Sequence, residues 1–209
     1  MRYLKCAALA LVAMGCGHSN YEISRYHEDG RAKPLVAVAS MIDTTSFDAA
    51  WSLSEEFTAS VVNQVSQGGE IFVILQEEFP FSENPFSGGD LSWMRREFQD
   101  KEFVVFLELV EHEIVPAEKN RSPLEVSSNL NMAVRVRVVD LRPAQPKVVL
   151  QEMVRDTYFI PKTLIPTDYS VVVWGSDEYR KSPIGIAHAQ VVNEISSRVS
   201  DYILLAKSR

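Results

Sequence analysis

The sequence predicts an α+β domain in which a mixed sheet of about five strands packs against two or three helices, with a tendency toward three layers. Apolar runs of strand length, rich in β-branched residues, recur along the chain. An early strand–helix–strand unit has a helix long enough to connect parallel strands. An amphipathic helix closes the chain and needs a sheet to cover its apolar stripe.

The first half of the chain supplies the strand–helix–strand unit. Residues 35–42 are a β-rich apolar run, typical of a buried strand. A helix is expected over 52–67, where Ser52 and Glu55 fit a capping box and a Gly-Gly pair ends the pattern. Residues 71–75 form the next strand, which we expect to run parallel to the first.

A loop and a short helix separate this unit from the third strand. Residues 79–89 contain two prolines and three phenylalanines, which indicates a loop. Asp90 is expected to cap a helix that runs through Phe98. The third strand is expected over 103–114, and 117–128 is a polar loop.

An antiparallel hairpin is expected next, over 132–141 and 147–159. Valines alternate with arginines in its first strand, so we expect one buried face and one wet face. Glu152 or Asp156 is expected opposite those arginines as an ion pair.

The last element is a long amphipathic helix over 183–206. Its expected apolar stripe consists of Ile184, Val191, Ile195, Val199, Tyr202 and Leu205 or Ala206.

The amino terminus has the pattern of an export signal. Arg2 and Lys5 are followed by nine uncharged apolar residues, and Gly15 precedes Cys16. A nine-residue helix is about 14 Å long, half of a bilayer core of ~30 Å, so this stretch is too short to span a membrane.

We therefore expect three parts in the chain. Residues 1–15 are a cleaved signal peptide, 16–33 are the lipidated cysteine and a flexible polar linker, and 34–209 are a single globular domain. Cys16 would carry the lipid, whose acyl chains anchor the protein.

The stretch from Val12 to Cys16 resembles the lipobox that lipoprotein signal peptidase recognises, with Ala13 where leucine is usual. Two alternatives stay open: ordinary signal peptidase cleaves after Gly15 and leaves a secreted protein, or the stretch is an uncleaved core segment. Gly17, in enteric bacteria, implies the outer membrane, and we expect the domain to face the periplasm.

The formal net charge of −7 indicates an acidic surface. Such a surface repels the phosphates of nucleic acids and anionic lipid headgroups, so nucleic acid is not an expected partner. Cys6 and Cys16 are the only cysteines, which excludes a cysteine-based zinc site.

No catalytic motif stands out in the sequence. His112 and Glu113 lack a second histidine nearby, so we expect a solvated strand end rather than a metal site. His188 is expected to be a packed helix residue bonded to a neighbouring loop. Asp140 ends a strand, where its side chain would cap the backbone of a turn. No metal, cofactor or catalytic residue is predicted.

The most informative cluster is aromatic. Phe79, Phe81, Phe86 and Trp93 lie in and beside the 79–89 loop. If exposed, they would form a patch for a protein partner. If folded back, they would cover the edge of the sheet.

The order of elements resembles the domain shared by curli-secretion lipoproteins, lipoprotein activators of penicillin-binding proteins and the amino-terminal domain of TolB. The matching segments are 35–40, 51–54, 61–67, 101–105, 136–140 and 186–188. Over nearly its whole length the chain resembles an uncharacterised chlamydial lipoprotein family of that fold. Where the wider family has Thr-Gly after the aspartate, this chain has Leu141-Arg142-Pro143. The resemblance implies the fold more than a function.

The function expected from these observations is non-catalytic. A periplasmic domain tethered to the membrane through Cys16 would bind another envelope protein or assemble with copies of itself. The alternative is an envelope enzyme, such as a hydrolase that acts on peptidoglycan. Paired acids in a groove would favour the enzyme, and an apolar patch without convergent titratable groups would favour binding.

Replacing Cys16 with serine should abolish incorporation of labelled fatty acid and release the protein from membranes, because the acyl chains are its predicted anchor. Metabolic labelling and membrane sedimentation measure both effects. The anchor is wrong if Cys16→Ser protein still sediments with membranes after a high-salt wash.

Overall fold

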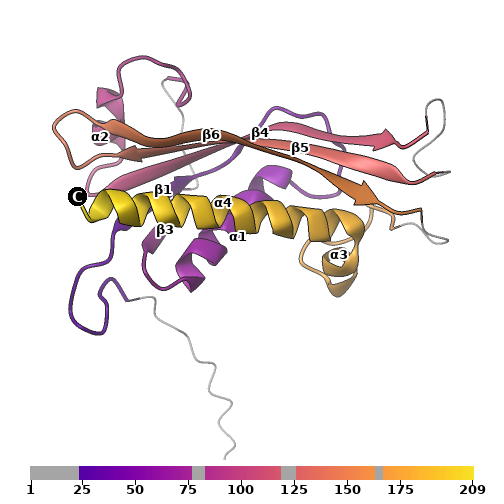
Figure 1. Cartoon of the computed structure of the whole chain (residues 1–209), viewed down its shortest axis with the longest axis horizontal. Helices are drawn as coiled ribbons and strands as arrows, with labels where there is room; N and C mark the ends of the chain where they lie inside the picture. Colours follow the sequence, from indigo (N-terminus) through magenta and orange to yellow (C-terminus); the bar gives the residue numbers. More distant parts are fainter. Residues whose placement is uncertain (1–23, 77–82, 119–125, 163–166) are drawn as a thin grey trace, which may run out of the picture.

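One mixed sheet organises the structure (Figure 1), with the strand order β3-β1-β4-β5-β6 and the short β2 paired to β4. The computed structural model describes residues 24–76, 83–118, 126–162 and 167–209. The elements are, in chain order, β1 (Leu35–Ala39), β2 (Ile42–Asp43), α1 (Leu53–Gln67), β3 (Phe72–Gln76), α2 (Ser92–Glu97), β4 (Phe103–Pro116), β5 (Ser128–Asp140), β6 (Lys147–Ile160), α3 (Asp177–Lys181) and α4 (Pro183–Lys207). The predicted α+β class is confirmed.

The sheet has a parallel half and an antiparallel half. β1 lies between β3 and β4 and runs parallel to both, as predicted for the strand–helix–strand unit. β4, β5 and β6 form an antiparallel meander of long strands. β1 and β2 accompany only the first part of β4, so the far end of the meander is a three-stranded ribbon.

The predicted capping box opens α1. The Ser52 hydroxyl accepts a hydrogen bond from the backbone N–H of Glu55, at 3.2 Å. Gly69 follows the helix with a φ of 76°, a left-handed conformation that favours glycine. α1 then enters β3 directly and covers the parallel half of the sheet.

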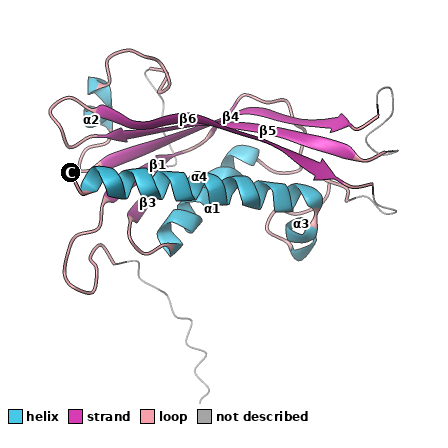
Figure 2. Ribbon diagram, viewed as in Figure 1, coloured by secondary structure: helices cyan, strands magenta, loops and turns pink. Residues whose placement is uncertain are grey.

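Helices cover the two faces of the sheet unequally (Figure 2). α1 and α4 pack on one face, and this layer holds the larger apolar core, centred on residues such as Phe57, Val105, Val134, Ile195 and Ile203. α2 covers only one end of the opposite face, over a smaller apolar cluster. No helix of the described residues covers the rest of that face, along the ribbon.

Two expectations about the hairpin are wrong. Arg137 is buried rather than wet, because its guanidinium donates to the backbone carbonyls of residues 85–87 that cover this end of the face. Arg135 pairs across the sheet with Glu108 of β4, at 2.9 Å. The predicted pairing of Glu152 or Asp156 with the arginines is wrong. Register places Glu152 opposite Val136, on the helical face, where it meets Arg198 of α4 at 2.9 Å.

The apolar stripe of α4 differs from the expected one at its carboxyl end. Ile184, Val191, Ile195 and Val199 are buried as predicted, and Ile203 continues the stripe. Tyr202 and Leu205 are exposed, whereas Ala206, the predicted alternative to Leu205, packs against the core. Ile203, four residues after Val199, lies on the side of the helix that faces the sheet. Tyr202 and Leu205, three and six residues after Val199, lie on the side that faces solvent.

The amino-terminal end of the described chain is more ordered than a plain linker. Tyr26 and Ala32 form an isolated antiparallel bridge. The backbone N–H of His27 donates to the Arg31 carbonyl and that of Lys33 to the Arg25 carbonyl. Cys16 and the rest of the predicted signal peptide lie outside the described residues. Within the described part of the chain, no helix is long and apolar enough to cross a membrane.

Replacing Ile195 with alanine should lower the free energy of unfolding by about 2–5 kcal/mol, because the side chain is fully buried between α4 and the sheet. The matched control is Ser197→Ala on the exposed side of the same helix, which should change stability by less than about 0.5 kcal/mol. Urea unfolding measures both. Equal stability of the two variants would contradict the packing of α4.

Candidate functional site

Four titratable side chains meet in the helical layer of the domain. Glu56 comes from α1, His112 from β4, Tyr179 from α3 and His188 from α4, and each is 5% exposed or less. The segment before α1 adds Trp51 and Phe47, the latter with its ring 4.2 Å from that of His112. We call Glu56, His112, Tyr179 and His188 the buried cluster.

A β-bulge places His112 in this cluster. The register of β4 against β5 shifts between Leu109 and Glu111, so that Val110 is an extra residue. Side chains alternate between faces along a strand, and one extra residue exchanges the faces for everything that follows. His112 therefore points into the helical layer, whereas Glu113 is exposed. The expected solvated position of His112 is wrong for this reason.

The Glu56 carboxylate is the centre of the hydrogen bonds. One oxygen accepts from the Tyr179 hydroxyl and lies 2.8 Å from Nδ1 of His188. The other accepts from the indole N–H of Trp51, at 2.7 Å. Nε2 of His188 lies 2.8 Å from Nε2 of His112, so one of the two nitrogens carries the shared proton.

The close approach of α3 to α4 depends on a glycine. A Cβ at Gly185 would overlap the backbone carbonyl of Tyr179. The Ser182 hydroxyl caps α4 by accepting from the Gly185 N–H, at 3.1 Å. The missing side chain at residue 185 thus lets Tyr179 reach Glu56.

Burial sets the protonation of two members of the cluster. It lowers the pKa of His112 to about 3, with a further contribution from His188. It raises the pKa of Tyr179, and the neighbouring Glu56 carboxylate raises it further. At neutral pH the His112 imidazole is therefore neutral and the Tyr179 phenol keeps its proton.

Hydrogen bonds within the buried cluster engage both imidazole nitrogens of His188. Nδ1 of His188 faces Glu56 and Tyr179, and its Nε2 faces Nε2 of His112. Nδ1 of His112 has no hydrogen-bond partner, but it is enclosed. A cavity of about 260 Å³ between α1 and α4 is lined by Glu56 and His188 together with Ser60 and Asn63. Among the described residues, no three histidine, cysteine or acidic side chains are grouped to hold a metal.

The two other polar residues singled out from the sequence are structural. His188 is packed in a helix as expected, but its partners come from α1, α3 and β4 rather than from a loop. The Asp140 carboxylate accepts a hydrogen bond from the backbone N–H of Arg142, at 3.0 Å, which is the predicted turn cap.

The structure places the predicted aromatic patch only in part. Trp93 is 6% exposed and packs near Phe106, with ring centroids 6.5 Å apart. Phe86 is half-buried, with its ring against the guanidinium groups of Arg135 and Arg137. Phe79 and Phe81 lie outside the described residues. Trp93 and Phe86 thus fold back onto the sheet, and Trp93 offers no ring to a partner.

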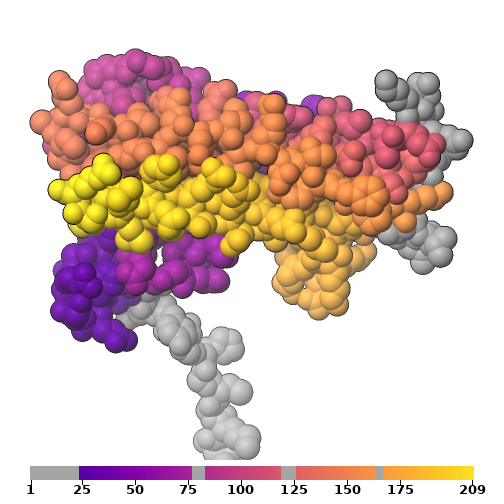
Figure 3. Space-filling model, viewed as in Figure 1, coloured from indigo at the N-terminus to yellow at the C-terminus, as the bar shows by residue number. Residues whose placement is uncertain are grey.

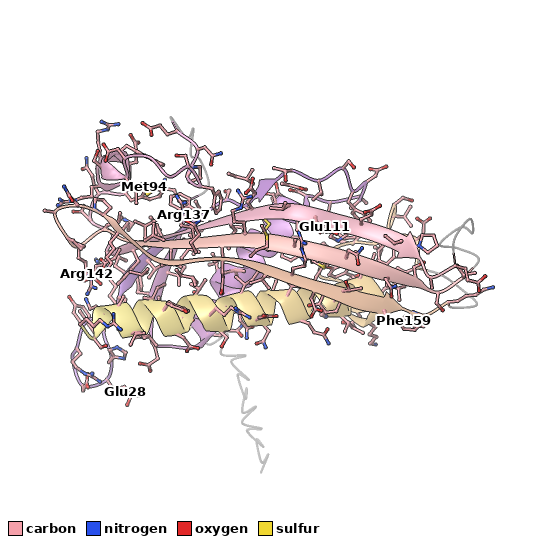
Figure 4. The ribbon with its side chains drawn as sticks, turned by 45° about the horizontal axis from the view of Figure 1, so that its top comes forward. Glu28, Met94, Glu111, Arg137, Arg142 and Phe159 are labelled. Carbon is pink, nitrogen blue, oxygen red and sulfur yellow. The ribbon has the colours of Figure 1, made fainter. Side chains whose placement is uncertain are left out.

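A different exposed surface runs along β6, from the level of β2 out onto the ribbon. On the face opposite α4, Met153 and Phe159 of β6 are 40% and 64% exposed, and Val115 of β4 lies in the same cross-strand row as Phe159. Figure 4 shows Phe159 and Glu111 toward one end of the sheet, far from Arg142. Among the described strands, none pairs with the outer edge of β6. We call Val115, Met153, Phe159 and this edge the ribbon surface.

Comparison with known proteins identifies the fold. The sequence matches the model of a family of unknown function, DUF7499, over residues 22–207. A crystal structure of the hypothetical protein CT253 from Chlamydia trachomatis is similar with a TM-score of 0.64 and 22% identity, covering 82% of this chain and 98% of that one. At this identity the likeness shows the fold alone.

Two further structures are similar at lower scores. The PelC dodecamer from Paraburkholderia phytofirmans has a TM-score of 0.48 and 12% identity, covering 81% of this chain and 87% of that one. Lipoprotein GNA1162 from Neisseria meningitidis has a TM-score of 0.41 and 13% identity, with coverages of 78% and 99%. Both scores are too low to support an argument. No curated protein is significantly similar in sequence.

Acidification should destabilise the fold through His112. Its pKa falls from 6.5 to about 3 on folding, so the unfolded chain takes up the proton first. The stabilisation is fully present above pH 6.5 and is lost as the pH falls toward 3. Each pKa unit corresponds to about 1.4 kcal/mol, so several kcal/mol are involved.

The His112→Gln substitution removes the titrating imidazole, so the variant should lose less free energy of unfolding than the parent on acidification. Urea unfolding between about pH 7 and pH 4.5 measures the slope. If variant and parent lose the same free energy over that range, His112 does not titrate as described.

Proposed function

The chain belongs to the family of unknown function DUF7499, and from this premise we propose that it is a lipid-anchored cell-envelope protein that binds another envelope protein or assembles with copies of itself. The domain has a binding role and no catalytic one. Cys16 carries the anchor, and the domain is held at the outer membrane, facing the periplasm.

The observation that carries the proposal is the closed state of the buried cluster. An imidazole that acts as a general base must lie within hydrogen-bond reach of the proton that it removes, directly or through one water. In His188 both nitrogens are used within the cluster, and the Tyr179 phenol is held protonated. The cluster ties three helices to the sheet, and this role accounts for each of its hydrogen bonds.

The ribbon surface is the part of the domain best suited to a protein partner. The outer edge of β6 presents backbone N–H and C=O groups that can add a strand from another chain. Exposed Met153 and Phe159 beside this edge supply apolar area that becomes buried on contact. Charged residues such as Arg155 and Asp156 limit pairing with unrelated strands.

The alternative function is an envelope hydrolase that acts on peptidoglycan. The cavity between α1 and α4 is the observation in its favour, because Glu56 and His188 reach its wall. Glu56 is the one carboxylate among the lining residues, however, and glycoside hydrolysis generally uses two.

A capture experiment tests the ribbon surface. In lipidated protein that carries Met153→Lys and Phe159→Lys, the affinity for the partner, or for other copies of the chain, should fall by at least about tenfold, because charge is introduced into the contact. The melting temperature should stay near that of the parent, since both side chains are exposed. Cross-linking in envelopes followed by affinity capture, and light scattering of the purified protein, measure the two forms of assembly.

The matched control changes Val171→Lys and Val173→Lys. These two side chains are 70% exposed and lie outside the ribbon, between β6 and α3. The control should retain every complex of the parent. If Met153→Lys and Phe159→Lys protein also retains them, the ribbon surface is not the binding site.

A further inference from the structure

Charge is distributed unevenly along the molecule, although its total is negative. One end of the sheet gathers the amino-terminal turn, the β5–β6 turn, α2 and the carboxyl end of α4 (Figure 3). Contacts connect these segments: Lys207 lies 2.5 Å from Glu102, whose other oxygen accepts from the Leu35 N–H, and Arg142 donates to the carbonyl of Ala206. We call this end of the domain the basic end.

Cations without a carboxylate partner are concentrated at the basic end. Within the part of the chain that the structure describes, no ion pair is formed by Arg25, Lys33, Arg95, Lys101, Lys147 or Arg209. Several carboxylates of this end are neutralised locally, as Asp29 is by Arg31 and Asp140 by Arg142. Glu28, Glu70, Asp90 and Asp100 are exposed carboxylates of this end that no described lysine or arginine pairs with, so its unpaired cations exceed its unpaired carboxylates by two.

The opposite end has the reverse balance. Exposed carboxylates there include Glu113, Asp156, Asp168 and Glu178. Among the described residues of this end, the exposed lysines are Lys162 and Lys181, and the exposed Arg155 and Arg180 are paired with Glu111 and Asp177. Figure 4 shows the two ends of the long axis, with Arg142 and Glu28 at one end and Glu111 and Phe159 toward the other. The domain is therefore polarised along its length.

The predicted lipid anchor is connected to the domain at its basic end. Ser24 is the first described residue, eight positions after Cys16. Eight residue steps span at most about 28 Å of extended chain, so a lipid on Cys16 holds the amino-terminal turn within that distance of the bilayer. The end of the domain closest to the membrane is thus the end that holds most of the described lysines and arginines without an ion pair.

We propose that the basic end docks on the anionic phospholipid headgroups of the membrane that holds the anchor. This inference rests on the lipid anchor of the proposed function and adds an orientation to it. An anionic surface attracts lysine and arginine within a screening length of about 8 Å, and it repels the acidic end. The long axis then points away from the bilayer, and the ribbon surface is presented to partners in the periplasm.

Energy transfer to the bilayer tests the orientation. The full lipidated protein is labelled at Ser208→Cys, on the basic end, or at Val171→Cys, near α3, and reconstituted into vesicles that contain an acceptor lipid. Replacing about one third of phosphatidylcholine by phosphatidylglycerol should raise transfer from residue 208 and lower it from residue 171. About 1 M salt should abolish the difference, because the screening length falls to ~3 Å.

Paired charge reversals give the control. Lys147→Glu with Arg209→Glu should reduce the ratio of docked to undocked protein by about fivefold for each cation lost. Lys162→Glu with Lys181→Glu makes the same change in net charge at the acidic end and should leave docking intact. Equal transfer from residue 208 in both kinds of vesicle would overturn the docking surface. Failure of the protein to float with vesicles would instead overturn the anchor, and docking with it.

Discussion

The carboxylate of Glu56 is the point on which the helical layer depends. A buried carboxylate is strongly unfavourable unless hydrogen bonds and nearby charge compensate for lost hydration. Trp51, Tyr179 and His188 supply that compensation, and His112 joins from the sheet. The same hydrogen bonds fix α3 and the first turns of α4 against α1. Removing one partner would leave the others buried and unsatisfied, so the contributions of these residues to stability are coupled.

Much of the fold follows from local patterns in the sequence. The capping residue Ser52, the parallel strand–helix–strand unit and the antiparallel hairpin are determined by neighbouring residues and short loops, and the structure confirms them. Patterns of this kind do not show which segment covers a sheet face. Alternation along β5 predicts that Arg137 is exposed, yet backbone carbonyls 50 to 52 positions away in the sequence cover its guanidinium. Ile203, rather than Tyr202, extends the stripe of α4 because the underlying sheet determines the rotation of the helix.

The buried cluster was much harder to predict. Glu56 and His188 are 132 positions apart, and no motif connects them. The bulge at Val110 inverts the faces of β4, so strict alternation assigns His112 to the wrong side. One signal was available: His188 lies in register with the apolar stripe of a long helix, where an unpartnered imidazole would be costly. That position calls for a buried partner, but it does not identify Glu56, Tyr179 or His112. Charge shows a similar limit, because a net value of −7 conceals a basic end.

A double-mutant cycle on Glu56 and His188 tests most directly whether the cluster is a structural clamp. Urea unfolding of Glu56→Ala, His188→Ala and the double variant gives the coupling free energy. For a clamp, each single change should cost about 3–5 kcal/mol, and the double change should cost clearly less than their sum, because the second removal leaves no further orphaned partner. Single variants as stable as the parent, with additive small effects, would contradict the account and return these two residues to consideration as a reactive pair.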